Sequence, residues 1–438
     1  MLSKFCRFIA VNEHKTAVFN SILFKPVIMD EKECMALKNN ELYKFNETEL
    51  NELRCRGIIT ENSLKDEQAL SLLKRHVEEC TKNGISLIYI IPSNFCNLAC
   101  KYCFIGKLDD NAVQEIEFKT IDNIIQKYVA HLRKNHFLKA SVVFYGAEPL
   151  TAFNKIKYAV EKFKSIIDIN WEFSIVTNGT LINDEIVAFF KENNFGVGVS
   201  IDGPKDINDL NRIFKYNSDI SVYDTIISKL KVLKDNGVSV GLSITLTQAI
   251  LDNKKKFFEW LKNLGVKDIN YNLLHYTSKC DDWEQYYCAA SKFLFESDKI
   301  LRQLNVVDDR LQRKIRAFNS DEFKYNDCGA IGGHQLCFAP NGDITVCHGY
   351  WHSEKERCGN INNDSFEDVM ETQTFKKWQN NLTVRKAECL NCEAIYMCGG
   401  GCAMQSEDLF GDQNNIDRGF CIHTKESLKE LLEDLVEQ

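Results

Sequence analysis

The sequence predicts an α/β protein built around a partial (β/α)6 barrel, with a small α+β domain before it and a cysteine-rich domain after it. Two observations support this prediction. Between residues 86 and 275, six short apolar runs alternate with stretches of helical period, which is the pattern of a parallel sheet covered by helices. Residues 328–438 hold nine of the 18 cysteines, which sets this last part of the chain apart.

The six apolar runs are the expected barrel strands. They lie at residues 86–91, 141–146, 172–179, 196–203, 239–246 and 268–274. Six such repeats suit an open barrel of the TIM type, although the pattern alone does not exclude a doubly wound sheet. In both folds the working site lies at the carboxyl ends of the parallel strands.

The flanking regions have patterns of their own. In residues 1–82, two apolar runs flank the polar stretch Asn12–Lys15, which predicts a β-hairpin. Asn46 and Glu49 form an N-cap and N3 pair at the start of a helix, and a second helix is expected to begin near Ser63. Residues 276–327 are expected to form a helical connector, and residues 328–438 an irregular domain.

Charge and hydropathy exclude some classes of function. The formal net charge is −8, so there is no basic excess to displace counterions from nucleic acid. The longest apolar run, near Leu87–Pro92, is far shorter than the roughly 20 residues that a membrane-spanning helix needs. The first ten residues lack the apolar core and cleavage site of a secretory signal. We therefore expect a cytoplasmic protein without a nucleic-acid or membrane partner.

Cysteine is the compositional outlier. Because disulfides are rare in reducing cytosol, a dense cysteine set in a chain without an export signal is expected to bind metal or to act in catalysis. Six cysteines are scattered through the chain and are expected to be buried thiols. These are Cys6, Cys34, Cys55, Cys80, Cys280 and Cys288.

The first cluster comprises Cys96, Cys100 and Cys103, which follow the first barrel strand. Three thiolates in one short loop can bind three irons of a [4Fe–4S] cluster, leaving the fourth iron open to a small molecule. A zinc site and a set of unrelated buried thiols are the alternatives. A structural zinc site normally has four ligands, and three cysteines do not complete one.

This cluster resembles the hallmark of the radical S-adenosylmethionine (radical SAM) superfamily, Cys-x3-Cys-x2-Cys after the first strand of a partial barrel. Tyr102 occupies the family's aromatic position before the last cysteine. In the family, the open iron binds the amino and carboxylate groups of S-adenosylmethionine (AdoMet). Reductive cleavage of AdoMet then gives a 5′-deoxyadenosyl radical that abstracts a hydrogen atom from the substrate.

Three further motifs lie at expected strand ends. Gly146-Ala147-Glu148-Pro149 resembles the family's Gly-Gly-Glu-Pro motif, which positions the methionine amino group, with alanine in place of the second glycine. Thr177-Asn178-Gly179 resembles its Thr-Asn-Gly turn. Ser200–Pro204 followed by Arg212 resembles the segment that contacts the ribose and carboxylate of the cofactor. The resemblance therefore implies that AdoMet is bound by Tyr102, Gly146, Ala147, Glu148, Asn178, Ser200, Asp202 and Arg212.

The C-terminal cysteines form a second pattern, which includes a Cys-x2-Cys-x5-Cys-x3-Cys run from Cys389 to Cys402. Spacing alone fits either one zinc ion or parts of two iron–sulfur clusters. The layout resembles the SPASM extension of radical SAM enzymes, which implies two auxiliary [4Fe–4S] clusters and three clusters in all. The implied ligands of the nearer cluster are Cys328, Cys347, Cys402 and Cys337, and those of the outer cluster are Cys389, Cys392, Cys398 and Cys421. Cys358 is a further candidate ligand, with a plain buried thiol as the favoured interpretation.

The resemblance to SPASM enzymes implies a peptide or protein substrate. One subclass, the maturases of ribosomally made peptides, commonly has Cys-His where this chain has Cys347-His348, and an N-terminal domain that binds the precursor's leader. Residues 1–82 are loosely compatible with such a domain, because a hairpin edge can accept a peptide strand; a purely structural cap is the alternative. The expected function is then oxidative crosslinking of a precursor peptide at an unactivated carbon, by a thioether, carbon–carbon or ether link.

Two alternatives remain open. Anaerobic sulfatase maturases, which form formylglycine, resemble the chain in both cluster regions, but they carry an acidic residue where His348 lies. A zinc-stapled, non-catalytic peptide-binding protein is the alternative from another class. His348 is the candidate base because the unperturbed pKa of histidine lies near neutrality, with a hydrogen-bonded structural histidine as the favoured interpretation. An electron donor such as a flavodoxin or ferredoxin is the other expected partner.

Overall fold

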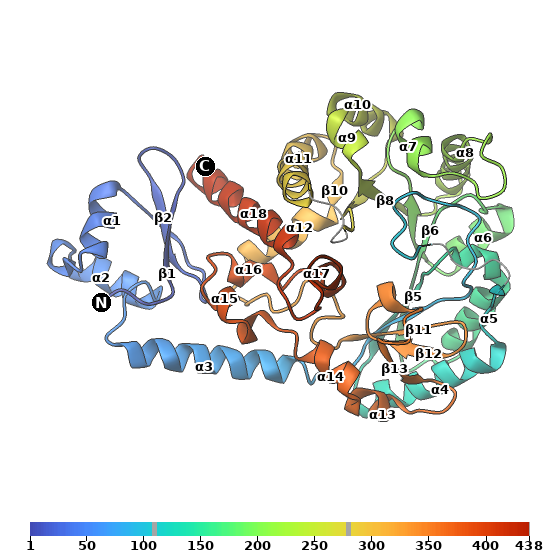
Figure 1. Ribbon diagram of the computed structural model, residues 1–438, viewed down its shortest axis with the longest axis horizontal. Helices are drawn as coiled ribbons and strands as arrows, with labels where there is room; N and C mark the ends of the chain where they lie inside the picture. The colour runs from blue at the N-terminus through green and yellow to red at the C-terminus, as the bar shows by residue number, and fades with distance from the viewer. Residues whose placement is uncertain (107–111, 277–281, 438) are drawn as a thin grey trace.

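The computed structural model describes residues 1–106, 112–276 and 282–437, so the expectation for Cys280 falls outside the described residues. One ten-stranded sheet passes through the larger part of the molecule, in the order β10-β9-β8-β7-β6-β5-β4-β11-β12-β13 (Figure 1). A separate three-stranded sheet, β1-β2-β3, lies at the opposite end of the view.

The central six strands form the predicted partial barrel. They are β4 (Leu87–Ile90), β5 (Lys139–Phe144), β6 (Asn170–Thr177), β7 (Gly196–Ser200), β8 (Val240–Leu246) and β9 (Asp268–Leu273). All neighbouring pairs are parallel, and each strand lies beside the next in the sequence. A doubly wound sheet reverses its strand order at a switch point, and this order never reverses. The barrel prediction is therefore confirmed and the doubly wound alternative is wrong.

Helices connect these strands and cover the sheet. They are α4 (Phe118–Lys134), α5 (Phe153–Lys164), α6 (Asp184–Glu192), α7 (Lys205–Asn211), α8 (Val222–Asp235), α9 (Gln248–Asp252) and α10 (Lys254–Leu264). Their apolar faces and the strands share one large core, which includes fully buried Ile124, Phe163 and Ile226. This core fixes the strand ends, and the strand ends carry the candidate site.

The sheet continues at both edges beyond the expected barrel. A two-residue strand, β10 (Val307–Asp308), pairs with β9. In the sequence it lies between α11 (Trp283–Gln303) and α12 (Asp309–Phe318). At the other edge, β11 (Gln335–Phe338) pairs in parallel with β4, and the antiparallel strands β12 (Asp343–Thr345) and β13 (Arg357–Asn360) follow. The C-terminal region is thus more regular than the sequence predicted. These strands could not be predicted because they have only three or four residues each and show no clear period.

The N-terminal region contains the predicted hairpin, β1 (Cys6–Ala10) and β2 (Thr16–Asn20), with β3 (Val27–Met29) as a third strand. Helices α1 (Glu31–Lys38) and α2 (Glu47–Cys55) follow, and α2 begins with the predicted capping box of Asn46 and Glu49. The second predicted helix is α3 (Ser63–Cys80), which runs from this region toward the barrel (Figure 1).

The remaining C-terminal helices are short except for the last. They are α13 (Phe366–Glu371), α14 (Gln373–Gln379), α15 (Ala387–Leu390), α16 (Ile395–Cys398), α17 (Ala403–Phe410) and α18 (Arg418–Glu437). Residues of β2, α16 and α18 share a buried cluster that contains Phe19, Tyr396 and Leu428, so the two ends of the chain pack together. Among the described residues, no helix has the length and apolar character that crossing a membrane requires.

Candidate active site

Cys96, Cys100 and Cys103 lie on the loop after β4, at the carboxyl end of the parallel strands. The segment 211–215 holds this loop in place. Two amides of the loop donate hydrogen bonds to carbonyls of the segment, at 2.8 and 3.0 Å. The amide of Cys103 donates to the carbonyl of Cys100 at 3.2 Å, which closes a tight turn between these two cysteines.

The three thiols lie near one another. The pKa of Cys96 is raised to about 12 and that of Cys100 to about 11, mainly by burial, and the neighbouring Cys103 contributes to both. The amide of Leu98 donates to Cys96 Sγ at 3.4 Å. Three neighbouring thiols on one loop with an amide donor are the donor set of an iron–sulfur cluster, so the residues at this loop fit that group.

Glu148 is the acidic residue at the end of β5, and it is buried. Its carboxylate accepts hydrogen bonds from the amide of Leu150 at 3.0 Å, the hydroxyl of Thr177 at 2.6 Å and the amide of Asn178 at 2.7 Å. Burial nevertheless raises the pKa of Glu148 to about 6. A carboxylate held in this way is ready to receive a cationic group.

Gly146 explains why the turn before Glu148 begins with glycine. Its φ is +122°, and a Cβ at this position would lie 2.5 Å from Cγ2 of Ile91. Both the backbone conformation and the close approach therefore require glycine. Ala147 is half-buried beside it.

Asn178 joins the turn after β6 to the cysteine loop. Its Nδ2 donates to the side-chain oxygen of Asn97 at 2.8 Å and lies 3.9 Å from Cys96 Sγ. Its Oδ1 accepts from the amide and the hydroxyl of Thr180, at 3.0 and 2.7 Å. The sequence did not single out Asn97 or Thr180, although both lie within two residues of predicted positions.

Asp202 and Arg212 pair with each other. Arg212 Nε and Nη2 donate to the two Asp202 carboxylate oxygens at 2.8 and 3.2 Å, and both side chains are buried. The Tyr102 hydroxyl also donates to Asp202, and the Arg212 guanidinium lies 5.6 Å from the centre of the Tyr102 ring. Three residues predicted to bind AdoMet thus form one cluster beside Cys100, and Ser200 lies half-buried at the end of β7.

The nearer auxiliary set lies against the first cysteine loop. The pKa of Cys347 is raised to about 12, mainly by burial and also by the thiols of Cys328 and Cys337. Cys347 and Cys328 in turn contribute to the raised pKa of Cys402, after burial. Cys337, on β11, is fully buried. Cys358 is also buried, and its thiol faces the carbonyl of Glu356 at 3.7 Å.

Tyr145 packs in one hydrophobic cluster with Cys337 of the nearer set and Ile105, two residues after Cys103. The pKa of its hydroxyl is raised to about 12, mainly by burial and also by the thiols of Cys103, Cys347 and Cys337. One side chain therefore neighbours the first cysteine loop and the nearer auxiliary set at the same time. The two sets face a common region at the carboxyl ends of the strands.

The outer set comprises Cys389, Cys392, Cys398 and Cys421. Cys389, Cys398 and Cys421 line a small cavity, together with Lys386, Gly400 and Phe420. The pKa of Cys389 is raised to about 12, mainly by burial and also by the neighbouring thiols of Cys398 and Cys392. Three thiols lining one cavity, with Cys392 nearby, fit a bound cluster.

A single metal ion is a different case. Across the described ranges, no three His, Cys, Asp or Glu side chains are close enough together to hold one ion. A zinc site requires its ligands to converge at about 2.0–2.3 Å from one centre. Thiolates that ligate separate irons of one cluster do not have to approach each other so closely.

His348, the predicted base, stacks on Tyr89 with ring centres 4.5 Å apart and lies edge-on to Tyr145 at 4.8 Å. Burial lowers the pKa of His348 to about 4, so the ring is neutral near pH 7. Its Nδ1 is buried and has no hydrogen-bond partner among the described residues.

A second histidine, His275, lies just after β9 at the same strand ends. Its Nδ1 is 3.1 Å from the Asp408 carboxylate on α17, and its ring centre is 6.1 Å from that of Phe104. Burial lowers the pKa of His275 to about 4, so the neutral ring donates through Nδ1–H to Asp408. Its Nε2, which has no hydrogen-bond partner among the described residues, is then a proton acceptor. The strand-end rule could have identified His275, whereas Asp408 gave no sequence signal.

Comparison with known proteins gives two family matches. The model of the radical SAM superfamily matches residues 90–262. The SPASM model, described as an iron–sulfur cluster-binding domain, matches residues 328–393. The first match includes the loop with Cys96, Cys100 and Cys103. The second includes five of the eight proposed auxiliary ligands, and Cys398, Cys402 and Cys421 lie beyond it.

Three relatives are similar to the chain over most of their own lengths. The radical SAM cyclopropyl synthase TigE of Paramaledivibacter caminithermalis is 27% identical, over 81% of this chain and 75% of the relative. The uncharacterized protein MJ0907 of Methanocaldococcus jannaschii is 33% identical, over 60% and 85%. A cysteine-type anaerobic sulfatase-maturating enzyme of Clostridium perfringens is 25% identical, over 73% and 88%.

Solved structures support the fold. The structure of anSMEcpe with bound AdoMet matches with a TM-score of 0.69 and 22% identity, over 80% of this chain and 98% of that one. The structure of Streptococcus suis SuiB bound to the precursor peptide SuiA matches with a TM-score of 0.56 and 16% identity, over 96% and 99%. The second match extends over nearly the whole chain, including the N-terminal region.

Proposed function

The chain belongs to the radical SAM superfamily and carries a SPASM iron–sulfur domain, and we propose that it modifies a ribosomally made precursor peptide by oxidative crosslinking. Membership makes it an enzyme that binds AdoMet and iron–sulfur clusters. The non-catalytic zinc-protein alternative therefore falls away. The peptide substrate, the crosslink and the number of clusters belong to the proposal.

The packing of Tyr145 beside both cysteine regions carries this proposal: it shares one hydrophobic cluster with Cys337 of the nearer set and with Ile105, two residues after Cys103. A cluster at Cys96, Cys100 and Cys103 would supply the reductive cleavage of AdoMet. Forming a crosslink after hydrogen abstraction removes one further electron and one proton from the substrate. An electron acceptor beside the AdoMet site suits that requirement, and an external flavodoxin or ferredoxin would supply the first electron.

The residues around the loop have separate proposed roles. Glu148 holds the amino group of AdoMet, and Asn178 positions Cys96 through its amide. Asp202 orients Arg212 and Tyr102 beside the cofactor's ribose and carboxylate, with Gly146, Ala147 and Ser200 forming the adjoining strand ends. These roles extend the sequence predictions to the observed hydrogen bonds.

Two histidines compete for the role of base. Burial lowers the pKa of both rings to about 4, so they differ in their partners. His348 is flanked by two aromatic rings. His275 lies beside the Asp408 carboxylate, which fixes its tautomer in the arrangement of many general bases. We therefore propose His275 with Asp408 as the proton acceptor, and His348 as the alternative.

The peptide would be held by the N-terminal region. Its three-stranded sheet leaves β1 and β3 as edge strands, and an extended peptide can add to such an edge. The similarity to SuiB, whose structure was solved with a precursor peptide, includes this region of the chain. Residues 1–82 are thus the proposed leader-binding domain.

The decisive experiment uses a short peptide encoded beside this gene. Anaerobically reconstituted enzyme is incubated with AdoMet, a reductant and the peptide, and the products are analysed by mass spectrometry. Crosslinking predicts a product lighter by two hydrogen atoms, together with 5′-deoxyadenosine. The similarity to sulfatase-maturating enzymes favours the second candidate, formylglycine formation. An aldehyde on a Cys- or Ser-containing sulfatase peptide, without crosslinking of the neighbouring peptide, would establish that candidate instead.

A further inference from the structure

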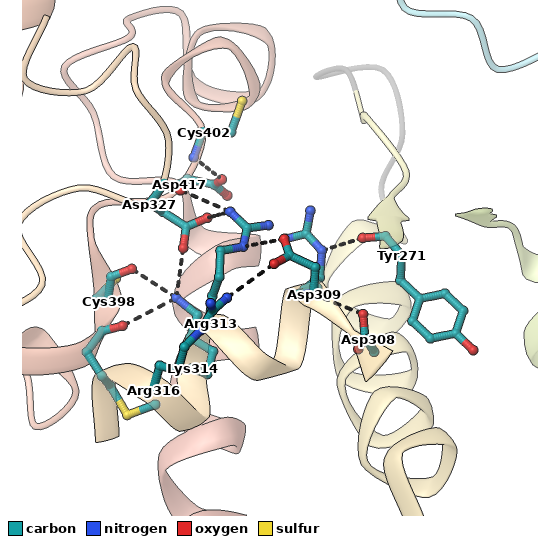
Figure 2. Close-up of polar contacts among 12 residues, drawn as sticks. Tyr271, Asp308, Asp309, Arg313, Lys314, Arg316, Asp327, Cys398, Cys402 and Asp417 are labelled. Carbon is teal, nitrogen blue, oxygen red and sulfur yellow. Dashed lines mark hydrogen bonds and ion pairs between the residues drawn. The ribbon is translucent and has the colours of Figure 1, made fainter. Parts of the chain in front are cut away.

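Helix α12 carries three cations, Arg310, Arg313 and Lys314, into the region between the two auxiliary cysteine sets. Figure 2 shows Arg313 and Lys314 reaching from this helix toward Asp327, with Cys398 on one side and Cys402 on the other. Asp327 directly precedes Cys328 of the nearer set, and Cys398 belongs to the outer set. The helix therefore contacts Cys398 of the outer set and the residue directly before Cys328 of the nearer set.

Lys314 is the most buried of these cations, with a side chain that is 2% exposed. Its Nζ donates to the carbonyls of Cys398 at 2.9 Å and Met397 at 3.4 Å. It also lies 3.3 Å from Asp327 Oδ1 and 4.3 Å from the centre of the Phe420 ring. Every one of these contacts lies on a segment next to a proposed cluster ligand.

Asp327 balances the cations. Arg313 Nη1 donates to its backbone carbonyl at 3.0 Å and lies 3.5 Å from its Oδ2. Burial alone would raise the pKa of Asp327, but Lys314, Arg313 and Arg310 hold it well below its usual value. The carboxylate is therefore paired directly with two cations of α12.

Stability does not explain this arrangement. Burying a lysine and a carboxylate has a large desolvation cost, and apolar side chains of similar volume often stabilise a fold equally well or better. A buried cation in such a place acts instead on charge that changes nearby. One-electron reduction of an iron–sulfur cluster adds one negative charge, and surrounding charge and hydrogen bonding set its potential.

We propose that Lys314 raises the reduction potential of the outer auxiliary cluster, and so makes that cluster a better electron acceptor. The ammonium group favours the reduced form, which is the more negative one, over the oxidised form. Its hydrogen bond to the Cys398 carbonyl places this charge at the ligand segment itself. The inference rests on the proposed ligand set of the outer cluster.

The test is a redox titration of the reconstituted full-length enzyme with dithionite, followed by electron paramagnetic resonance. The outer-cluster signal is identified by its loss in Cys392→Ala. Lys314→Met should lower the midpoint potential of that signal, and Lys314→Arg should leave the potential at its wild-type value. Asp327→Asn, which removes the opposite charge, should raise the potential. Opposite shifts from the two partners cannot come from general loosening of the fold.

Arg316→Met is the matched control. Arg316 lies on the same helix, carries the same charge and is 67% exposed, so water screens it. Its removal should leave the potential unchanged. Equal potentials in wild type and Lys314→Met, or equal shifts in Lys314→Met and Arg316→Met, would overturn the inference.

Iron content separates this inference from the proposed function. About twelve irons per chain, from three four-iron clusters, together with an unshifted potential would refute only the role of Lys314. Iron for a single cluster would refute the proposed ligand sets, and with them the premise. The double variant Lys314→Met/Asp327→Asn removes both charges at once, so its potential should return toward the wild-type value. It also provides a test if either single variant folds poorly.

Discussion

Replacing Glu148 by glutamine should weaken AdoMet binding while leaving the fold nearly as stable. The carboxylate accepts three hydrogen bonds, from Leu150, Thr177 and Asn178. A glutamine oxygen can replace only one carboxylate oxygen. Its NH2 group would face either the amide of Asn178 or the donors from the other two residues.

The stability change combines two opposing effects at pH 7. One lost buried acceptor costs about 1–3 kcal/mol. Against this, burial raises the pKa of Glu148 from its ordinary value of 4.5 to about 6. Keeping the carboxylate ionised in the folded protein at pH 7 therefore costs about 2 kcal/mol of stability. Glutamine carries no charge and avoids that loss. The free energy of unfolding of Glu148→Gln should therefore lie within about 1 kcal/mol of wild type, by the same two figures.

AdoMet affinity should respond differently. A hydrogen bond to a charged group contributes about 1.5–3 kcal/mol, so loss of the bond to the cofactor's amino group should reduce affinity by about 10- to 100-fold. Calorimetric titration of reconstituted enzyme with AdoMet, without reductant, measures this directly. Glu172→Gln, at an exposed site on β6, is the control and should bind as wild type. Unchanged affinity in a folded Glu148→Gln variant would refute the assigned role.

The pH dependence has a definite sign. Because the folded pKa of Glu148 is higher than its unfolded value, the folded protein binds the proton more tightly. Its contribution to stability should therefore rise as the pH falls from about 6 toward about 4.3. Urea unfolding of wild type against Glu148→Gln across this range isolates the effect, and a constant difference between the two would contradict it.

Three other predictions concern the same region. Gly146→Ala should destabilise the protein by at least about 1 kcal/mol more than Gly237→Ala in urea unfolding. Both glycines have positive φ, but only at Gly146 would a Cβ meet a neighbour closer than 4 Å; equal losses would contradict this. His275→Ala and Asp408→Asn should each reduce peptide modification by about 100-fold or more, with no further loss in the double variant, as measured by product mass spectrometry. Cys337→Ala should change the paramagnetic spectrum of the nearer cluster, and an unchanged spectrum would remove Cys337 from its ligands.

Much of the fold could be predicted because long parallel strands leave a strong pattern. The six apolar runs matched β4 to β9, since each buried strand is continuous and each is followed by a helix. Strands such as β10 and β11 could not be predicted, because two to four residues show no period. Their pairing depends on contacts with β9 and β4, which are distant in the sequence.

The site was predictable where a motif fixes a residue to a strand end, as with Glu148 and Asn178. Contacts between segments far apart in the sequence were not. The pairing of Asp202 with Arg212 and Tyr102, and that of His275 with Asp408, depend on how loops and domains meet. The burial of Lys314 likewise follows from tertiary packing, since α12 alone resembles an ordinary charged helix.

The most direct test of the central claim is AdoMet cleavage by a variant with Cys96, Cys100 and Cys103 all replaced by alanine. Reduced, reconstituted wild-type enzyme should convert AdoMet to 5′-deoxyadenosine, measured by chromatography. The triple variant should form none, while it retains the iron bound by the C-terminal cysteines. Cleavage by the triple variant at the wild-type rate would contradict the assignment of this loop as the AdoMet-cleaving centre.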